Sequence, residues 1–151
     1  MGVPMQIRTK GIPDNVSKAI CKDSVRFYGK QLFSTRLYKN IKVLLIFDKL
    51  PNQINALCQW ADDNHTCREF VIIVNKKLNK KTTLIALAHE MVHVKQFAKR
   101  ELKDYLRSDI VKWKGKTFSL DKVKYWSCPW EKEAYKNDGI LYEMYKQSKK
   151  K

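Results

Sequence analysis

The segment from Thr82 to Phe97 constrains this chain most, because it predicts a helix with chemistry on one face. Apolar residues recur along it at helical spacing, which indicates a helix packed against a core. These apolar positions are Leu84, Leu87, Ala88, Met91, Val94 and Ala98. The same segment contains the motif His89-Glu90-Met91-Val92-His93. The two histidines lie about one turn apart, so both imidazoles can reach one metal ion.

Glu90 directly follows the first histidine, and its carboxylate is therefore expected beside the metal. In helices with the pattern His-Glu-x-x-His, the histidines bind zinc and the glutamate takes a proton from a zinc-activated water. The alternative is a helix with two solvated histidines and an incidental glutamate. Two of the three histidines in the chain belong to this motif, which favours the metal. We expect Zn2+ as cofactor, His89 and His93 as ligands, and Glu90 as the catalytic base.

The composition is that of one folded domain. With 151 residues, of which 44% are hydrophobic, the chain can bury a core of its own. We expect a single domain over residues 1–151, with an irregular lead-in at 1–12 and a basic tail at 146–151. No apolar run is long enough to span a membrane, and the first residues lack the apolar region of a signal peptide. A cytoplasmic location without membrane contact follows as the expectation.

The remaining sequence predicts a mixture of helices and strands. A helix is expected from an N-cap at Asp14 to about Leu32. Continuous β-branched runs and turn residues indicate strands and a hairpin. The expected elements are strands at 41–47, 56–61 and 69–75, a hairpin around Lys114-Gly115, and a last helix beginning near Pro129. Trp113 and Phe118 in this hairpin could stack on nucleic-acid bases, but we favour packing against the core.

The chain is strongly basic, with 31 lysine and arginine residues against 15 acidic ones and a net charge of +16. Such a charge favours nucleic acid, an acidic protein or another polyanion as partner. A solvated basic surface without a particular partner is the alternative. Four lysines precede the metal helix, where the positive end of its dipole disfavours them, and this hints at a use for the charge. They are Lys76, Lys77, Lys80 and Lys81.

A catalytic zinc usually has three protein ligands and a water, so one further ligand is needed. The metzincin extension of the motif is absent, because Gln96 and Lys99 stand at its Gly and His positions. The remaining histidine, His65, lies in a predicted turn. A carboxylate from the last helix is the better candidate, and Glu131 and Glu133 both lie near its start. These glutamates could instead serve only the N-terminal dipole of that helix.

Three segments together resemble the small zincin-like metallopeptidases found in tailed-phage genomes. They are Ala88–Gln96, Trp113–Lys116 and Pro129–Tyr135. More distantly, the chain is similar to minigluzincins and to ImmA/IrrE-type and SprT-like proteins, over about residues 67–145. The resemblance implies an α+β, zincin-like fold with a small, mostly antiparallel sheet packed on the active-site helix. An N-terminal helix and a C-terminal helix that supplies the third ligand complete this expected fold.

The same resemblance implies site residues. The gluzincin pattern Glu-x-x-Ala-Asp corresponds to residues 131–135, which makes Glu131 the third zinc ligand and leaves Glu133 as the fallback ligand. Tyr135 stands where the pattern has Asp or Asn to orient a histidine. Tyr125, Tyr135 and His65 are candidate hydrogen-bond donors to the oxyanion of the transition state.

The function implied is that of a gluzincin-like zinc metallopeptidase acting on a peptide or protein, located in the host cytoplasm or in the virion. In zincins a strand beside the active-site helix often pairs with the substrate, and residues 70–74 are the candidate here. An ordinary interior strand is the alternative for these residues. The alternative function is a basic nucleic-acid- or virion-associated protein that retains a structural or vestigial zinc site.

Overall fold

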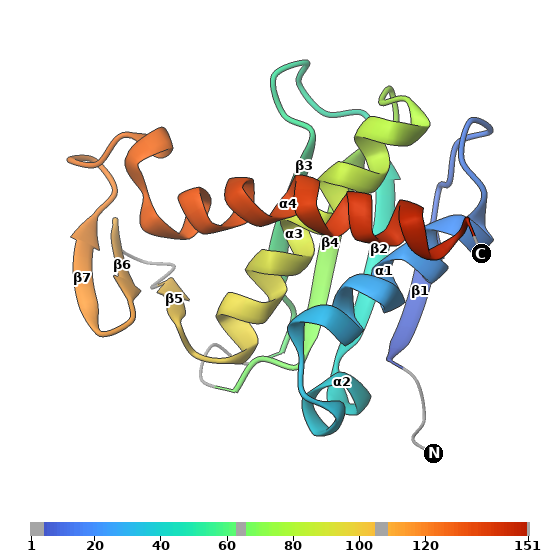
Figure 1. The fold of residues 1–151 in the computed structure, drawn as a ribbon. Helices are drawn as coiled ribbons and strands as arrows, with labels where there is room; N and C mark the ends of the chain where they lie inside the picture. Colours follow the sequence, from blue (N-terminus) through green and yellow to red (C-terminus); the bar gives the residue numbers. More distant parts are fainter. Residues whose placement is uncertain (1–4, 63–65, 105–108, 151) are drawn as a thin grey trace.

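The computed structural model describes residues 5–62, 66–104 and 109–150. Its elements, in chain order, are β1 (Gln6–Lys10), α1 (Lys18–Leu32), α2 (Thr35–Asn40), β2 (Lys42–Asp48), β3 (Ala56–Trp60), β4 (Glu69–Asn75), α3 (Lys80–Ala98), β5 (Leu102–Asp104), β6 (Ile110–Trp113), β7 (Lys116–Ser119), a 3-10 turn η1 (Tyr125–Ser127) and α4 (Pro129–Ser148) (Figure 1). The expected α+β class is confirmed, as are the strands β2, β3 and β4. None of the helices in these ranges is long and apolar enough to cross a bilayer.

The main sheet has the strand order β1-β2-β4-β3. Among its described strands, β2 pairs in parallel with both β1 and β4, and the edge strand β3 pairs antiparallel with β4. The expectation of a mostly antiparallel sheet is therefore wrong for this main sheet. The reason lies in the connection: α1 and α2 link β1 to β2, and a helical crossover of this kind joins parallel strands.

Residues 6–10 were expected to be irregular, but they form β1. The strand runs from the pair Gln6–Lys42 to the pair Lys10–Ile46 along the edge of β2. Ile7, the second residue of this strand, is only 5% exposed and belongs to the core. The segment is too short and too polar to be recognised alone, and its conformation depends on pairing with β2.

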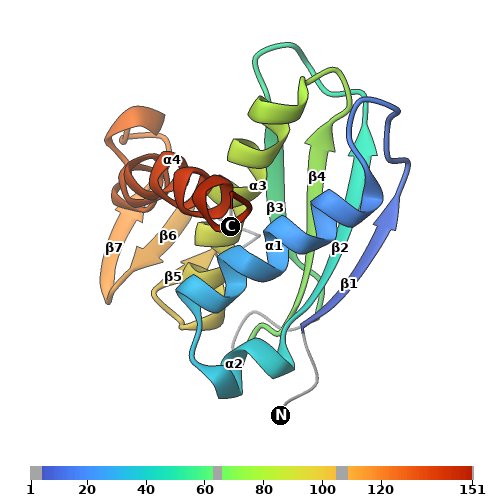
Figure 2. The same ribbon diagram turned by 45° about the vertical axis from the view of Figure 1, so that its right-hand side comes forward.

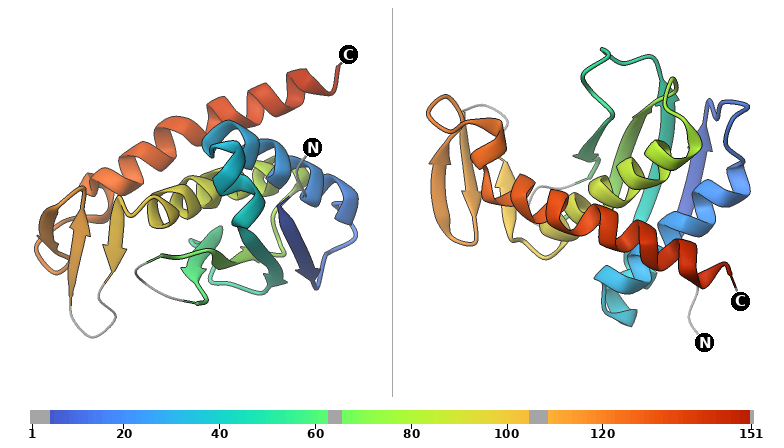
Figure 3. Two further views of the ribbon diagram at one scale, coloured as in Figure 1. Left: turned by 90° about the horizontal axis from the view of Figure 1, so that it is seen from below. Right: turned by 45° about the horizontal axis from the view of Figure 1, so that its top comes forward.

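One face of the main sheet is covered by α1 and α3, and α4 lies across both helices as an outer layer (Figures 2 and 3). The side chains of β1, β2 and β4 that face the core are almost fully buried. They are Ile7, Val43, Leu45, Phe47, Phe70, Ile72 and Val74. Because α3 lies between this sheet and α4, most of its residues are buried all round the helix. The sequence predicted burial on one face only, so α3 is more buried than expected.

The ends of the first and last helices differ from the expectation. Ser17, rather than Asp14, caps α1 by accepting a hydrogen bond from the amide of Ile20 at 3.0 Å, so the helix begins at Lys18. The expected basic tail at 146–151 is wrong for its first residues, because α4 continues to Ser148. Lys149, just after it, forms an ion pair with Asp23 of α1. This contact connects the C-terminal end of the described chain to α1.

The hairpin of β6 and β7 was predicted correctly, and it holds the start of α4 in place. Its turn residues Lys114 and Gly115 have φ angles of 49° and 85°, the left-handed pair that a tight hairpin requires. Trp113 and Phe118 pack on Trp130 of α4, with ring centroids 6.3 and 5.6 Å away. These aromatic side chains therefore anchor the hairpin, as the packing interpretation expected.

Candidate metal centre

Two imidazoles and a carboxylate converge where α4 begins to cross α3. Nε2 of His89 lies 3.0 Å from Oε1 of Glu131, and Nε2 of His93 lies 3.1 Å from the same oxygen. Within the described parts of the chain, these three side chains are the group of potential ligands whose donor atoms all lie within 4.8 Å of one another. We call His89, His93 and Glu131 the metal group.

The local sequence explains how the third member reaches this place. Pro129 is the first helical residue of α4, where a missing amide proton has no cost, and Glu131 lies in the same first turn. Gln96 of α3 donates a hydrogen bond from Nε2 to the carbonyl oxygen of Trp130 at 2.9 Å. This bond and the packing of Trp130 on the hairpin hold the first turn of α4 above the two histidines.

Each imidazole is oriented through its second nitrogen. Nδ1 of His89 lies 3.1 Å from Oδ2 of Asp138, and Nδ1 of His93 lies 2.7 Å from Oε1 of Gln96. Both partners are hydrogen-bond acceptors, so each Nδ1 carries the proton. Metal-binding histidines are held in this way, with the other ring nitrogen directed at the metal.

Asp138 and Gln96 are functional residues that the sequence analysis missed. The family pattern placed the orienting residue at position 135, where this chain has tyrosine, and the ring of Tyr135 instead packs on His89 at 4.4 Å between centroids. Asp138 follows Glu131 by seven residues, which is two helical turns, so both side chains lie on one face of α4. The acidic residue seven positions after Glu131 was the feature of the sequence that could have identified Asp138.

Glu133, the fallback ligand, has other partners in the structure. Its Oε1 lies 2.9 Å from Nζ of Lys95 and 3.0 Å from Nε2 of Gln96. Burial alone would raise the pKa of this carboxyl, but the bonds from Gln96 and Lys95 lower it. Glu133 therefore supports Gln96, which in turn orients His93, whereas the geometry brings Glu131 to the histidines.

The electrostatics of the metal group follow from its hydrogen bonds. Burial opposes the charged imidazole of His89, but its bonds to Asp138 and Glu131 outweigh this effect and raise its pKa to about 9. The pKa of His93 is also raised, since its bond to Glu131 outweighs burial. Burial would raise the pKa of Glu131, yet hydrogen bonds from both histidines lower it to about 2. Without a metal, protons on the imidazoles thus balance the carboxylate.

The metal group fits a metal ion. Two imidazole nitrogens and one carboxylate oxygen form a donor set that zinc commonly takes in catalytic sites. Neighbouring ligand atoms in a tetrahedral zinc site with bonds of about 2.0–2.1 Å lie about 3.3 Å apart. The distances of 3.0 and 3.1 Å between Glu131 and the histidines are close to this spacing. The group could therefore hold a metal ion.

Glu90 lies in a cleft beside the metal group. The cleft has a volume of about 230 Å³, and its walls include Glu90, His93, Glu131 and residues 56–58 of β3. Glu90 itself is only 5% exposed. Burial, which is the largest effect, raises the pKa of its carboxyl above the usual value despite the neighbouring histidines. The side chain is thus a stronger base than a solvated glutamate.

Two of the three candidate oxyanion donors lie at this site. The hydroxyl of Tyr125 donates to Oε1 of Glu131 at 3.1 Å and lies 3.2 Å from the hydroxyl of Tyr135. Burial of its phenol, followed by the bond to Tyr135, raises the pKa of Tyr125, so its hydroxyl keeps its proton. The third candidate, His65, lies outside the described residues.

The strand beside the site is not the one expected. Residues 70–74 belong to β4, which is paired on both sides, with β2 and β3. A strand with both edges paired cannot accept a peptide, so this candidate is wrong. β3 is the edge strand, and Ala56, Leu57 and Cys58 from it line the cleft with Glu90. The apolar continuity of β4 marks an interior strand.

Comparison with protein-family models, with curated proteins and with solved structures gave no match.

The first prediction concerns Asp138. In Asp138→Asn the carboxylate that orients His89 becomes an amide, so zinc affinity should fall by roughly 10–100-fold. Competition with a zinc-binding dye measures this change. Glu143→Gln, an exposed acid-to-amide change on the same helix, is the matched control and should keep the wild-type affinity. Equal zinc affinities in the two variants would show that Asp138 has no role in zinc binding.

The second prediction concerns pH. Because the pKa of His89 is raised to about 9, the metal-free protein holds a proton there that a zinc ion must displace. Zinc affinity should therefore fall as pH decreases from 9 to 6.5, by about tenfold per pH unit for each displaced proton. Calorimetry in buffers of different ionisation enthalpy counts the released protons. An affinity independent of pH, with no proton release, would contradict this protonation scheme.

Proposed function

We propose that this protein is a zinc-dependent metallopeptidase with a gluzincin-like site. The observation that carries the proposal is the position of Glu90, which lines one cleft with His93, Glu131 and the edge strand β3. A base, a metal group and the edge strand of the described sheet lie together in one cleft, and this combination suits the hydrolysis of a peptide. The resemblance of the three sequence segments to small zincin-like metallopeptidases agrees with this arrangement.

The residues have distinct roles in the proposed reaction. His89, His93 and Glu131 would hold the zinc, which when bound polarises a carbonyl group and lowers the pKa of a water. Glu90 accepts the proton of the attacking water, and its raised pKa suits this task. The protonated Glu90 then gives that proton to the leaving amine. Asp138 and Gln96 keep the two imidazoles in place throughout.

Tyr125 is the best-placed donor to the developing oxyanion. Its hydroxyl already contacts Glu131, and its raised pKa keeps the proton available for a hydrogen bond. Half of its surface is exposed, so the side chain can turn from Glu131 to a substrate oxygen. Tyr135, 3.2 Å away, supports the same hydroxyl. Such a donor acts where negative charge appears in the transition state.

The substrate class follows from β3. One edge of this strand pairs with β4, and residues 56–58 next to the cleft leave an edge for an extended peptide. Backbone hydrogen bonds to such an edge hold a peptide regardless of its side chains. Leu57, which is 40% exposed, offers an apolar contact beside the bound chain. We therefore expect extended or unfolded segments of proteins as substrates.

A second candidate function is a basic nucleic-acid- or virion-associated protein with a structural or vestigial zinc site. The net charge of +16 favours it. Structural zinc is held by four protein ligands, however, and the described residues bring three to the metal group. A buried base beside an incomplete coordination shell has no purpose in a purely structural site. The peptidase is therefore the better-supported function.

The test of the proposed function is Glu90→Gln. The amide keeps the size of the side chain but cannot accept the proton, so cleavage of a casein-type substrate should fall by roughly 100-fold or more. The zinc content, measured by mass spectrometry, should stay at the wild-type level. Glu143→Gln on α4 controls for loss of an acidic group. Undiminished cleavage by Glu90→Gln would exclude this residue as the base.

A further inference from the structure

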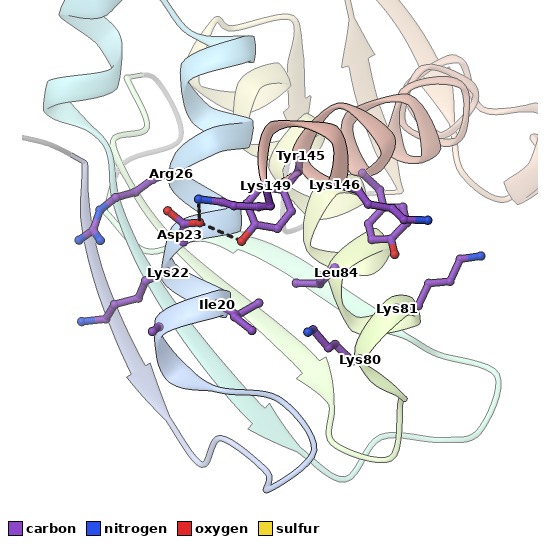
Figure 4. A pocket seen from close by; sticks show the side chains of 12 residues that line it. Ile20, Lys22, Asp23, Arg26, Lys80, Lys81, Leu84, Tyr145, Lys146 and Lys149 are labelled. Atoms are coloured by element: carbon purple, nitrogen blue, oxygen red, sulfur yellow. Dashed lines mark hydrogen bonds and ion pairs between the residues drawn. The ribbon is translucent and has the colours of Figure 1, made fainter. Parts of the chain in front are cut away.

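A second, larger cleft lies away from the metal group, between α1, the start of α3 and the end of α4 (Figure 4). Its volume is about 940 Å³. Of the described residues that line it, six are basic and one, Asp23, is acidic. The basic residues are Lys22, Arg26, Lys80, Lys81, Lys146 and Lys149. We call this feature the basic cleft.

The single acidic side chain is already engaged. Asp23 lies 2.6 Å from Nζ of Lys149 and accepts a hydrogen bond from the hydroxyl of Tyr145 at 2.9 Å. The bond to Lys149 is the main cause of the lowered pKa of Asp23. Lys80, Lys81 and Lys146 lie on the other side of Leu84 from this pair (Figure 4), and all three are exposed. The charge of these three lysines is available to a ligand.

Two helices begin at the basic cleft. Ala19 lies in the first turn of α1, Lys80 and Lys81 lie in the first turn of α3, and all three line the cleft. Neither first turn, both of them within the described ranges, has an acidic residue. The positive ends of both helix dipoles therefore add to the lysine charges. Lysines at the start of a helix are unfavourable alone, and an anion bound there would offset this cost.

The floor of the basic cleft is apolar. Ile20 and Leu84 lie between Asp23 and the three exposed lysines (Figure 4). The tyrosines Tyr142 and Tyr145 also line the cleft. Tyr145 packs edge-on against Tyr28 and Phe27, which makes this floor rigid. A ligand that fits the cleft therefore combines negative groups with an apolar body. Free inorganic anions match only the first of these properties.

We propose that the basic cleft binds a strand of nucleic acid, with its phosphates on Lys80, Lys81 and Lys146 and its sugars or bases on the apolar floor. Exposed lysines continue beyond the cleft, at Lys76 and Lys77 before α3, and a long polyanion reaches them while a mononucleotide does not. The cleft is concave between three helices, so a flat anionic bilayer does not reach its floor. Nucleic acid matches the charge, the apolar floor and the extent of the surface.

This binding site is separate from the metal group. Lys81 precedes His89 by eight residues, which is about 12 Å along α3. The proposal therefore holds or fails independently of peptidase activity. If both functions are present, one face of the molecule would hold nucleic acid while the metal cleft acts on a protein nearby.

Binding is tested by fluorescence anisotropy with a labelled 20-nucleotide oligo-dT strand, at several KCl concentrations, on the full chain. We expect Lys80→Ala/Lys81→Ala/Lys146→Ala to weaken binding at least tenfold near 0.1 M salt. Loss of three phosphate contacts should also make the slope of log K against log salt less steep by about 2. The control Lys30→Ala/Lys39→Ala/Lys42→Ala removes the same charge from exposed positions outside the cleft and should change binding much less.

Ala19→Glu is a second, independent variant. Ala19 is exposed in the first turn of α1, where a glutamate favours the helix dipole, so the fold should be as stable as in the wild type. The same glutamate places a negative charge in the basic cleft and should weaken strand binding. Thermal unfolding and anisotropy are measured together. Weaker strand binding with undiminished stability is expected from a binding site and not from general damage.

Four results would overturn the proposal. The first is a wild-type protein that does not bind the strand. The second is an equal loss of strand affinity in the triple variant and its control, which would mean that only the net charge of the protein matters. The third is stronger competition by poly-glutamate than by unlabelled strand, which would assign the cleft to acidic proteins. Competition by inorganic triphosphate equal to that of the strand would likewise reject a strand site. Glu90→Gln should bind the strand with the affinity of the wild type.

Discussion

The packing of α4 across α3 is the interaction on which the candidate metal centre depends. The two histidines come from α3, but the third donor, Glu131, and the partner of His89, Asp138, both come from α4. Gln96 connects the helices directly, because it donates to the carbonyl of Trp130 and accepts from His93. A change in the angle between the helices would separate the ligands and their orienting groups at the same time.

The burial of α3 determines the chemistry of the groups on it. His89, Glu90 and His93 are each less than 10% exposed, so each needs a partner or a use for its charge. The histidines have acceptors at both nitrogens, and their charge is shared with Glu131 and Asp138. Glu90 faces the cleft instead, and its raised pKa reflects the low polarity there. The structure thus separates the three potential metal ligands from Glu90, the proposed base.

Local patterns predicted much of the fold and the first half of the site. The spacing of His89 and His93 is a property of any helix, and the hairpin turn at Lys114-Gly115 is a short-range signal. β1 could not be predicted in this way, since its five residues become a strand only by pairing with β2. Asp138 was missed for a similar reason. Its role depends on the crossing of two helices, which brings His89 next to a residue 49 positions further along the chain.

The same distinction applies to the strands beside the site. β4 is the more apolar strand, but its position between β2 and β3 is set by the order of the strands in the sheet, which the sequence pattern did not show. β3 has a weaker pattern because it is an edge strand with one side near the cleft. A weak strand signal next to a strong one can therefore mark the functional edge of a sheet.

The central claim is that His89, His93 and Glu131 bind one zinc ion. Mass spectrometry of the metal content tests it most directly, on protein purified without chelating resin, for the wild type, Glu131→Ala and Glu133→Ala. The account predicts about one zinc per chain in the wild type, little or none in Glu131→Ala, and zinc retained in Glu133→Ala. A wild type that takes up no zinc even after addition, or a Glu131→Ala variant that keeps its zinc, would contradict the account.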